Sequence, residues 1–169
     1  ADTELAVLAD AQGRAGAAAP SLRLANFLQL RHHMSVDLYV ENMVSTARLV
    51  IVRLLGGTSY WPYGIEQIAA VCRRRGIGFA AVPGDDQPDP ELTQHSTLPA
   101  DDVHRIWQYL VHGGPGNAGN LLAFASDLLG FDRTWSEPAP LLTAGLYWPE
   151  IDAPDLSVIR AQWQTDAPV

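Results

Sequence analysis

The sequence predicts an α/β fold with an open, mostly parallel sheet and flanking helices. Residues 48–55 are a run of Leu, Val and Ile flanked by Arg, which is typical of a strand buried on both faces. Two glycines and an aromatic loop follow, and Pro62 then favours a helix start because its fixed φ suits the first turn. A second apolar run at 78–82 completes a strand–helix–strand unit.

Two strands and a helix are predicted before this unit. Residues 5–9 form a short apolar run and a candidate strand, which an Ala- and Gly-rich loop follows. Residues 22–30 fit either a strand or an apolar helix, and the strand is narrowly favoured. Ser35 is a candidate N-cap for an amphipathic helix at 35–46, where apolar side chains recur with a period of 3.6 residues.

Three longer helices are predicted from the aromatic loop onward. The first ends at Gly76, which suits the left-handed residue that closes a helix, and the arginines before it favour the negative end of the helix dipole. The second begins at Pro99 and breaks at 113–116. The third has Asn117 or a neighbour as its candidate N-cap and ends at Gly130.

A proline-rich change at 138–140 predicts a domain boundary. Residues 1–137 are expected to form an N-terminal α/β domain. Residues 138–169 are expected to be a linker strand and the start of a second α/β unit, with a strand at 142–147 and a last helical turn capped by Asp155. Because the chain begins without Met and ends in a polar turn, we expect a fragment of a longer polypeptide.

The alternation of strands and helices is typical of flavodoxin-like and Rossmann-like folds, whose crossovers are right-handed. Ligands of such folds usually lie beyond the carboxyl ends of the strands. A flavodoxin-type phosphate site is disfavoured, because the loop at 11–16 offers no hydroxyl groups.

Charge and composition exclude several functions. The 169 residues carry a net charge of −8, which argues against nucleic-acid binding. All 11 basic residues are Arg, so no Lys can serve a Walker-type P-loop or a pyridoxal Schiff base. Cys72 is the single cysteine, and we expect it to be buried and inert. With no apolar run of about 20 residues and no signal peptide, a cytoplasmic location away from membranes is expected.

Candidate polar contacts lie near the predicted helix at 35–46. His32 precedes this helix in a loop, and its imidazole can bind a metal or move a proton, although a hydrogen-bonded structural histidine is the other interpretation. Asp37 and Glu41 lie four residues apart, so they share a helix face and can hold a metal or shuttle a proton. A solvated helix face explains the two carboxylates equally well.

The aromatic loop supplies Tyr60, Trp61 and Tyr63, and Glu66 follows one turn later. Aromatic rings at the carboxyl end of a strand can stack on a flat macrocycle or on a partner protein, or can pack beneath the loop. No two histidines have the spacing of a His-x3-His metal clasp. The sequence therefore assigns no catalytic residue and no metal ligand.

Six motifs carry a resemblance to a known family. In order they are LRLAN at 22–26, LRHHMSVDLYVE at 30–41, VRLLGG at 52–57, YWPYG at 60–64, PGDD at 83–86 and AGLYWP at 144–149. In order and spacing these motifs resemble the N-terminal region of the large subunit of aerobic cobaltochelatases, CobN, within the CobN/magnesium-chelatase H family. The magnesium chelatase large subunit is related but carries different segments here. His33 departs from the pattern, because a proline is expected at its position.

The resemblance implies an ATP-dependent cobaltochelatase, a ligase that forms nitrogen–metal bonds in cobalamin biosynthesis. In that family the large subunit binds the tetrapyrrole hydrogenobyrinic acid a,c-diamide and inserts Co²⁺, which is a substrate. Two smaller subunits of the complex form an AAA+ ATPase, which hydrolyses ATP with Mg²⁺. The missing Walker lysine agrees with ATP being handled by those partners.

The resemblance also implies that this fragment alone is inactive and that the rest of the large subunit is a partner. Candidates for contact with the corrinoid or the metal are His32, Asp37, Glu41, Tyr60, Trp61, Tyr63 and Glu66. The alternative is a non-catalytic scaffold or interaction domain that contacts other chelatase domains or subunits. A free-standing small-ligand domain is a third, disfavoured reading.

Overall fold

The structure is a computed structural model, in which the described residues are 2–16, 19–140, 145–149, 151 and 155–162. The chain forms two compact units, Ala1–Ala139 and Pro140–Val169. The first unit combines helices with a parallel sheet, so the α/β class and the parallel strand pairing are confirmed.

The sheet pairs β1 (Leu49–Leu54) in parallel with β2 (Gly78–Pro83), and Leu49 lies opposite Gly78. Helix α3 (Pro62–Arg75) connects the two strands, with Pro62 in its first turn. Gly76 ends the helix in the left-handed conformation, with φ 69°. The strand–helix–strand unit and both of its predicted helix ends are therefore confirmed.

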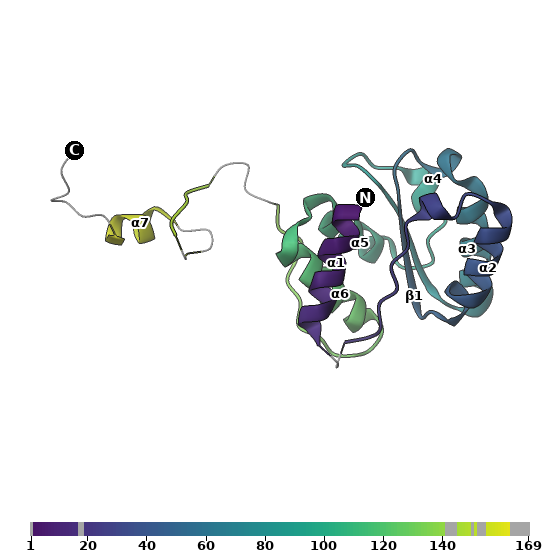
Figure 1. Cartoon of the computed structure of the whole chain (residues 1–169), viewed down its shortest axis with the longest axis horizontal. Helices are drawn as coiled ribbons and strands as arrows, with labels where there is room; N and C mark the ends of the chain where they lie inside the picture. Colours follow the sequence, from purple (N-terminus) through teal and green to yellow (C-terminus); the bar gives the residue numbers. More distant parts are fainter. Residues whose placement is uncertain (1, 17–18, 141–144, 150, 152–154, 163–169) are drawn as a thin grey trace. The chain divides into compact units, whose positions relative to one another are not determined.

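Helices cover both faces of the sheet in the first unit. On one face lie α3 and α2 (His33–Asn42), and on the other lie α1 (Asp2–Ala15), α5 (Ala100–His112) and α6 (Gly114–Leu128) (Figure 1). Strand residues serve the two cores alternately, because successive side chains point to opposite faces. Phe79 and Ala81 of β2 join the α2–α3 core, whereas Ala80 and Val82 join the α5–α6 core.

The strand predicted at residues 5–9 is wrong, because these residues lie inside α1. A five-residue apolar run fits a strand and a helix equally well, and Ala and Leu are strong helix formers. Packing decides the outcome: α1 lies against α6, and Leu8 packs on the α5–α6 core.

The region before α2 also differs from the prediction. Residues 19–26 form neither helix nor strand, and a 3₁₀ turn, η1, spans Phe27–Gln29, so the strand favoured at 22–30 is wrong. Ser35 is not an N-cap, because α2 begins two residues earlier, with His32 at the N-cap position. Likewise α6 begins near Gly113, which places Asn117 inside the helix. The remaining short elements of this unit are η2 (Val44–Thr46), η3 (Thr58–Tyr60) and α4 (Pro90–Thr93).

The outer edge of β2 is closed by side chains rather than by a third strand. The N–H of Phe79 donates to Thr97 Oγ1 at 2.8 Å, and the N–H of Ala81 donates to Ser96 Oγ at 2.9 Å. The next residue in this alternation, Pro83, has no N–H to donate. All the donors that this edge presents are therefore satisfied or missing, which protects it from pairing with another strand.

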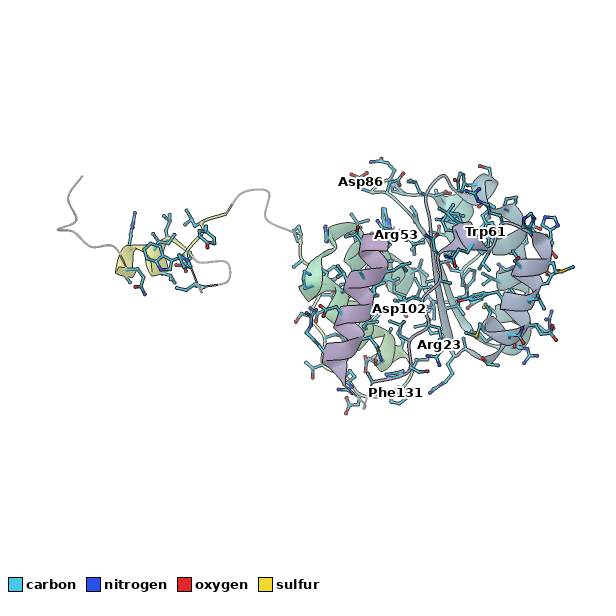
Figure 2. The ribbon with its side chains drawn as sticks, viewed as in Figure 1. Arg23, Arg53, Trp61, Asp86, Asp102 and Phe131 are labelled. Atoms are coloured by element: carbon cyan, nitrogen blue, oxygen red, sulfur yellow. The ribbon has the colours of Figure 1, made fainter. Side chains whose placement is uncertain are left out.

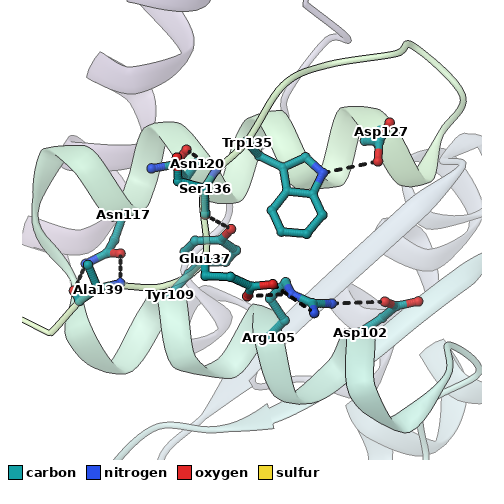
Figure 3. Close-up of polar contacts among 10 residues, drawn as sticks. All are labelled: Asp102, Arg105, Tyr109, Asn117, Asn120, Asp127, Trp135, Ser136, Glu137 and Ala139. Carbon is teal, nitrogen blue, oxygen red and sulfur yellow. Dashed lines mark hydrogen bonds and ion pairs between the residues drawn. The ribbon is translucent and has the colours of Figure 1, made fainter.

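Residues 131–139, which we call the strap, are fastened to α5 and α6 by a set of polar contacts (Figure 3). The Tyr109 hydroxyl donates to the carbonyl oxygen of Ser136, and Asn120 Oδ1 accepts from the Ser136 N–H at 2.9 Å. The buried Asn117 amide donates to the Ala139 carbonyl at 2.7 Å and accepts from its N–H at 3.0 Å. The strap thus belongs to the first unit.

Arg105 of α5 provides the charged contact with the strap. Its guanidinium binds both carboxylate oxygens of Glu137, at 2.9 and 3.2 Å, and lies 3.5 Å from Asp102. The same group lies over the rings of Phe124 and Trp135, 5.2 and 5.1 Å from their centroids. The bidentate ion pair with Glu137 and the cation–π contact with Trp135 fix the middle of the strap to Arg105, whose contact with Phe124 joins it to α6.

In the second unit, the described residues include a short helix, α7 (Leu156–Gln162). Asp155 Oδ1 accepts hydrogen bonds from the N–H groups of Ser157 and Val158, so its predicted role as a helix cap is confirmed. The Ser157 hydroxyl also donates to Asp155 Oδ1 at 2.6 Å, and this bond, followed by the main-chain bond from Val158, lowers the pKa of the Asp155 carboxyl. Of the strand predicted at 142–147, residues 142–144 lie outside the described residues, and residues 145–147 form neither helix nor strand. Within the described chain, no helix has the length and apolar character needed to cross a membrane.

Candidate functional site

Four of the seven candidate residues, His32, Tyr60, Trp61 and Tyr63, lie where η1 leads into α2 and η3 leads into α3, beyond the carboxyl end of β1, and the other three lie further along α2 and α3. We call this region the corner, comprising residues 27–33 and 58–63. Trp61 holds its two segments together, because its indole N–H donates to the Leu30 carbonyl at 3.0 Å. The indole is 8% exposed and lies on the α2–α3 side of the sheet, whereas Arg53 lies beside α1 on the opposite side (Figure 2).

Gly64 makes the buried position of Trp61 possible. A Cβ added at Gly64 would lie 2.1 Å from the indole ring, so the ring rests directly on the backbone of α3. Trp61 therefore acts as a packing anchor of the corner, and little of its surface is left for a ligand. The sequence left open whether the aromatic rings of this loop stack on a ligand or pack beneath the loop, and Trp61 packs beneath it.

Tyr60 has the opposite environment. Its side chain is 58% exposed, and its ring meets the ring of Phe27 edge-on, with 5.9 Å between the centroids. Phe27 also contacts Trp61, with 5.8 Å between centroids, so it links the exposed ring to the buried one. An exposed ring held from behind in this way can stack on a flat apolar ligand.

Tyr63 connects α3 to α2. Its hydroxyl donates to Asp37 Oδ1 at 2.7 Å, and its ring stacks on the His33 imidazole with 3.9 Å between centroids. The hydrogen bond to the Asp37 carboxylate, together with partial burial and the nearby negative charge, raises the pKa of the Tyr63 phenol. The structure thus brings a carboxylate, a phenol and an imidazole together on the surface.

The other three predicted residues are exposed around this group. His32 stands at the N-cap position of α2 without a side-chain cap, Glu41 lies one turn after Asp37, and Glu66 lies one turn after Tyr63. The structure therefore joins Asp37 directly to Tyr63, and Tyr60 to Trp61 through Phe27.

Two contact residues were missed by the sequence reasoning. The family resemblance weakens a role for His33, because a proline is expected at its position, yet His33 makes the ring contact with Tyr63. Its spacing of four residues from Asp37 was the available signal, because residues at i and i+4 share a helix face. Phe27 had no signal of its own, because its role depends on a 3₁₀ turn that the sequence did not predict.

The chemistry available at the corner is proton handling and ring stacking. Among the described residues, no three His, Cys, Asp or Glu side chains gather in an arrangement that could hold a metal ion. The Thr58 hydroxyl oxygen is buried and has no hydrogen-bond partner within the described chain, so a water or ligand atom can satisfy it. Cys72 is fully buried, and burial raises the pKa of its thiol to about 11, as expected for an inert cysteine.

Comparison with known proteins identifies relatives. The chain is 46% identical over 169 residues to the aerobic cobaltochelatase subunit CobN of Pseudomonas aeruginosa, covering 99% of this chain and 14% of that protein. It is 44% identical over 149 residues to the CobN subunit of a Sinorhizobium species, covering 88% of this chain and 12% of that protein. No family model and no solved structure matches the chain. The resemblance expected from the sequence is therefore confirmed, and along nearly its whole length this chain is a relative of aerobic cobaltochelatase subunit CobN.

Proposed function

We propose that this chain is part of a cobaltochelatase large subunit and that its corner contacts the tetrapyrrole into which Co²⁺ is inserted. The 46% identity across 99% of the chain carries the proposal. The corner supports it, because the Tyr60 ring is exposed and Tyr63, three residues later, is hydrogen-bonded to the Asp37 carboxylate.

The proposed roles follow from these environments. Tyr60 offers its ring face to the macrocycle, and Trp61 positions the loop from beneath. We assign His32 and Asp37 as candidate bases that take protons from ring nitrogens as the metal enters, with Tyr63 orienting Asp37 through its hydrogen bond. Glu41 and Glu66 supply negative charge along the path of an incoming cation.

The proposal extends to the whole assembly. It includes hydrogenobyrinic acid a,c-diamide as substrate, AAA+ ATPase partners that hydrolyse ATP with Mg²⁺, the remainder of the large subunit, and a cytoplasmic location. It also includes a larger flavodoxin-like or Rossmann-like sheet and a second α/β unit beginning in residues 138–169. The N-terminal position of this segment in the large subunit belongs to the same proposal.

An absorbance titration tests the proposal. Hydrogenobyrinic acid a,c-diamide is titrated with this chain and with the variants Tyr60→Ala and His32→Ala. We expect a saturable spectral shift that either substitution weakens. Tyr147→Ala is the matched control, because Tyr147 is 84% exposed and lies in the second unit.

The result also separates the proposal from its alternative. If this chain gives no shift while a full-length relative does, the segment is a scaffold or interaction domain and the tetrapyrrole contacts lie elsewhere. A shift that the Tyr147 variant weakens as much as the Tyr60 variant would contradict the assignment to the corner.

A further inference from the structure

Helix α2 exposes an apolar pair that nothing in the described chain covers. Met34 is 74% exposed and Leu38 is 53% exposed, and Met34 is the most exposed large apolar side chain among the described residues of the first unit. The two lie four residues apart, so their side chains are neighbours on one face of the helix. The opposite face of α2 packs into the core through Val36 and Val40, which fixes the direction in which the pair points.

Two carboxylates border this pair on the same helix. Viewed down the helix axis, Glu41 and Asp37 both fall on the Met34 side of the pair, at the i+7 and i+3 positions from Met34. Among the described residues, no arginine forms an ion pair with either carboxylate. Two of the three arginines at the end of α3, Arg73 and Arg75, donate to main-chain carbonyls instead.

The surface is also held in place before any partner arrives. Asp37 accepts the Tyr63 hydroxyl hydrogen bond, and His33 stacks on the same ring, so the side of α2 next to α3 is fixed. Met34 lacks such contacts, and the flexible thioether of methionine adapts to differently shaped apolar partners. An apolar centre with polar groups at its rim is the general composition of a protein-binding surface, and here the polar groups beside the pair are carboxylates.

We propose that the outer face of α2, formed by Met34, Asp37, Leu38 and Glu41, docks a basic amphipathic helix of a partner protein. The apolar stripe of that helix covers Met34 and Leu38. Its flanking Arg or Lys side chains pair with Asp37 and Glu41, which have no basic partner in the described chain. Met34 and Leu38 are not among the candidate tetrapyrrole contacts, whereas Asp37 and Glu41 are shared with them, so the peptide titration is judged separately from the tetrapyrrole titration.

A peptide titration followed by NMR tests the inference. The probe is a synthetic amphipathic helix with a leucine stripe flanked by arginines, and its counterpart carries glutamates in place of the arginines. We expect the basic peptide to give saturable amide shifts confined to α2, and the acidic peptide to give none. The double substitution Met34→Ser/Leu38→Ser and the single substitution Glu41→Arg should each weaken binding about tenfold or more. Leu55→Ser is the matched control, because Leu55 is 61% exposed but lies after β1.

Each other outcome overturns the inference. Equal binding of both peptides would indicate unspecific apolar contact, and absence of binding would indicate a free surface. Shifts located away from α2 would assign the partner to another face. Concentration-dependent shifts on α2 without any peptide would identify a second copy of this chain as the occupant instead.

Discussion

At Gly64 only a hydrogen fits, because an added Cβ would lie 2.1 Å from the Trp61 ring. We expect Gly64→Ala to force the indole away from α3 and to lower the free energy of unfolding by about 1–3 kcal/mol. Gly119→Ala in α6 is the control, since an added Cβ there meets nothing within 4 Å. It should stabilise the chain by about 0.5–1 kcal/mol, as alanine does inside a helix. Denaturant unfolding measures both values, and equal effects of the two substitutions would refute the packing role of Gly64.

A second prediction at the residue scale concerns Tyr109 at high pH. Burial is the main cause that raises the pKa of its phenol to about 12, from an ordinary value of 10.0. Because the folded state favours the neutral phenol, the stability from this preference is fully present below pH 10. It is lost as the pH rises from 10 towards about 12.

Chemical denaturation of the native chain and of Tyr109→Phe, at several pH values from 9 to about 12, measures this effect. The difference in unfolding free energy between them should stay constant up to about pH 10 and then shrink. Cys72 titrates in an overlapping range but is common to both chains, so it cancels in the difference. A difference that is independent of pH would contradict the assignment.

At the scale of elements, Thr97 protects the outer edge of β2. Thr97→Val keeps the shape but removes the acceptor for the Phe79 N–H, which would then be buried without a partner. Such a group costs about 1–3 kcal/mol, and the Phe79 amide should exchange its hydrogen correspondingly faster. Hydrogen-exchange NMR measures the rate. Thr46→Val is the control, because the Thr46 hydroxyl makes an exposed bond to the Met43 carbonyl. Unchanged protection at Phe79 would show that Thr97 is not the edge cap.

The same elements show how far the sequence could predict the fold. The unit from β1 through α3 to β2 was predictable because each boundary carried a local signal: Pro62, Gly76 and two uninterrupted apolar runs. The segment at 5–9 had no such boundary signal, and its helical state depends on contact with α6, over a hundred residues away.

The candidate site was predictable only in part, for the same physical reason. Spacing on one helix indicated that Asp37 and Glu41 share a face, but the contact between Asp37 and Tyr63 joins two helices. The burial of Trp61 depends on Gly64 and on the Leu30 carbonyl, and no sequence pattern indicates that either of them contacts an indole.

At the scale of the whole molecule, the contacts of the strap distinguish between two possible ends of the first unit, after residue 137 or after residue 139. The predicted boundary lies after residue 137, whereas Asn117 holds the main chain of Ala139 by two hydrogen bonds. A chain that ends at residue 139 keeps both bonds. A chain that ends at 137 leaves the Asn117 amide, which is 6% exposed, without its strap partners.

The Asn117 Nδ2 still donates to the Gly113 carbonyl at 2.8 Å, but its Oδ1 loses the Ala139 N–H, so we expect the 1–137 chain to be less stable than the 1–139 chain by about 1–3 kcal/mol, the cost of leaving a buried acceptor unpaired. Comparing the two chains by denaturant unfolding, with and without Asn117→Ala, isolates the contribution of the hydrogen bonds between Asn117 and Ala139. With alanine at 117 the two lengths should become equally stable, because no amide is left to satisfy. If the shorter chain matches the longer one with Asn117 present, the boundary after residue 137 is the correct one and the last strap residues contribute nothing to the fold.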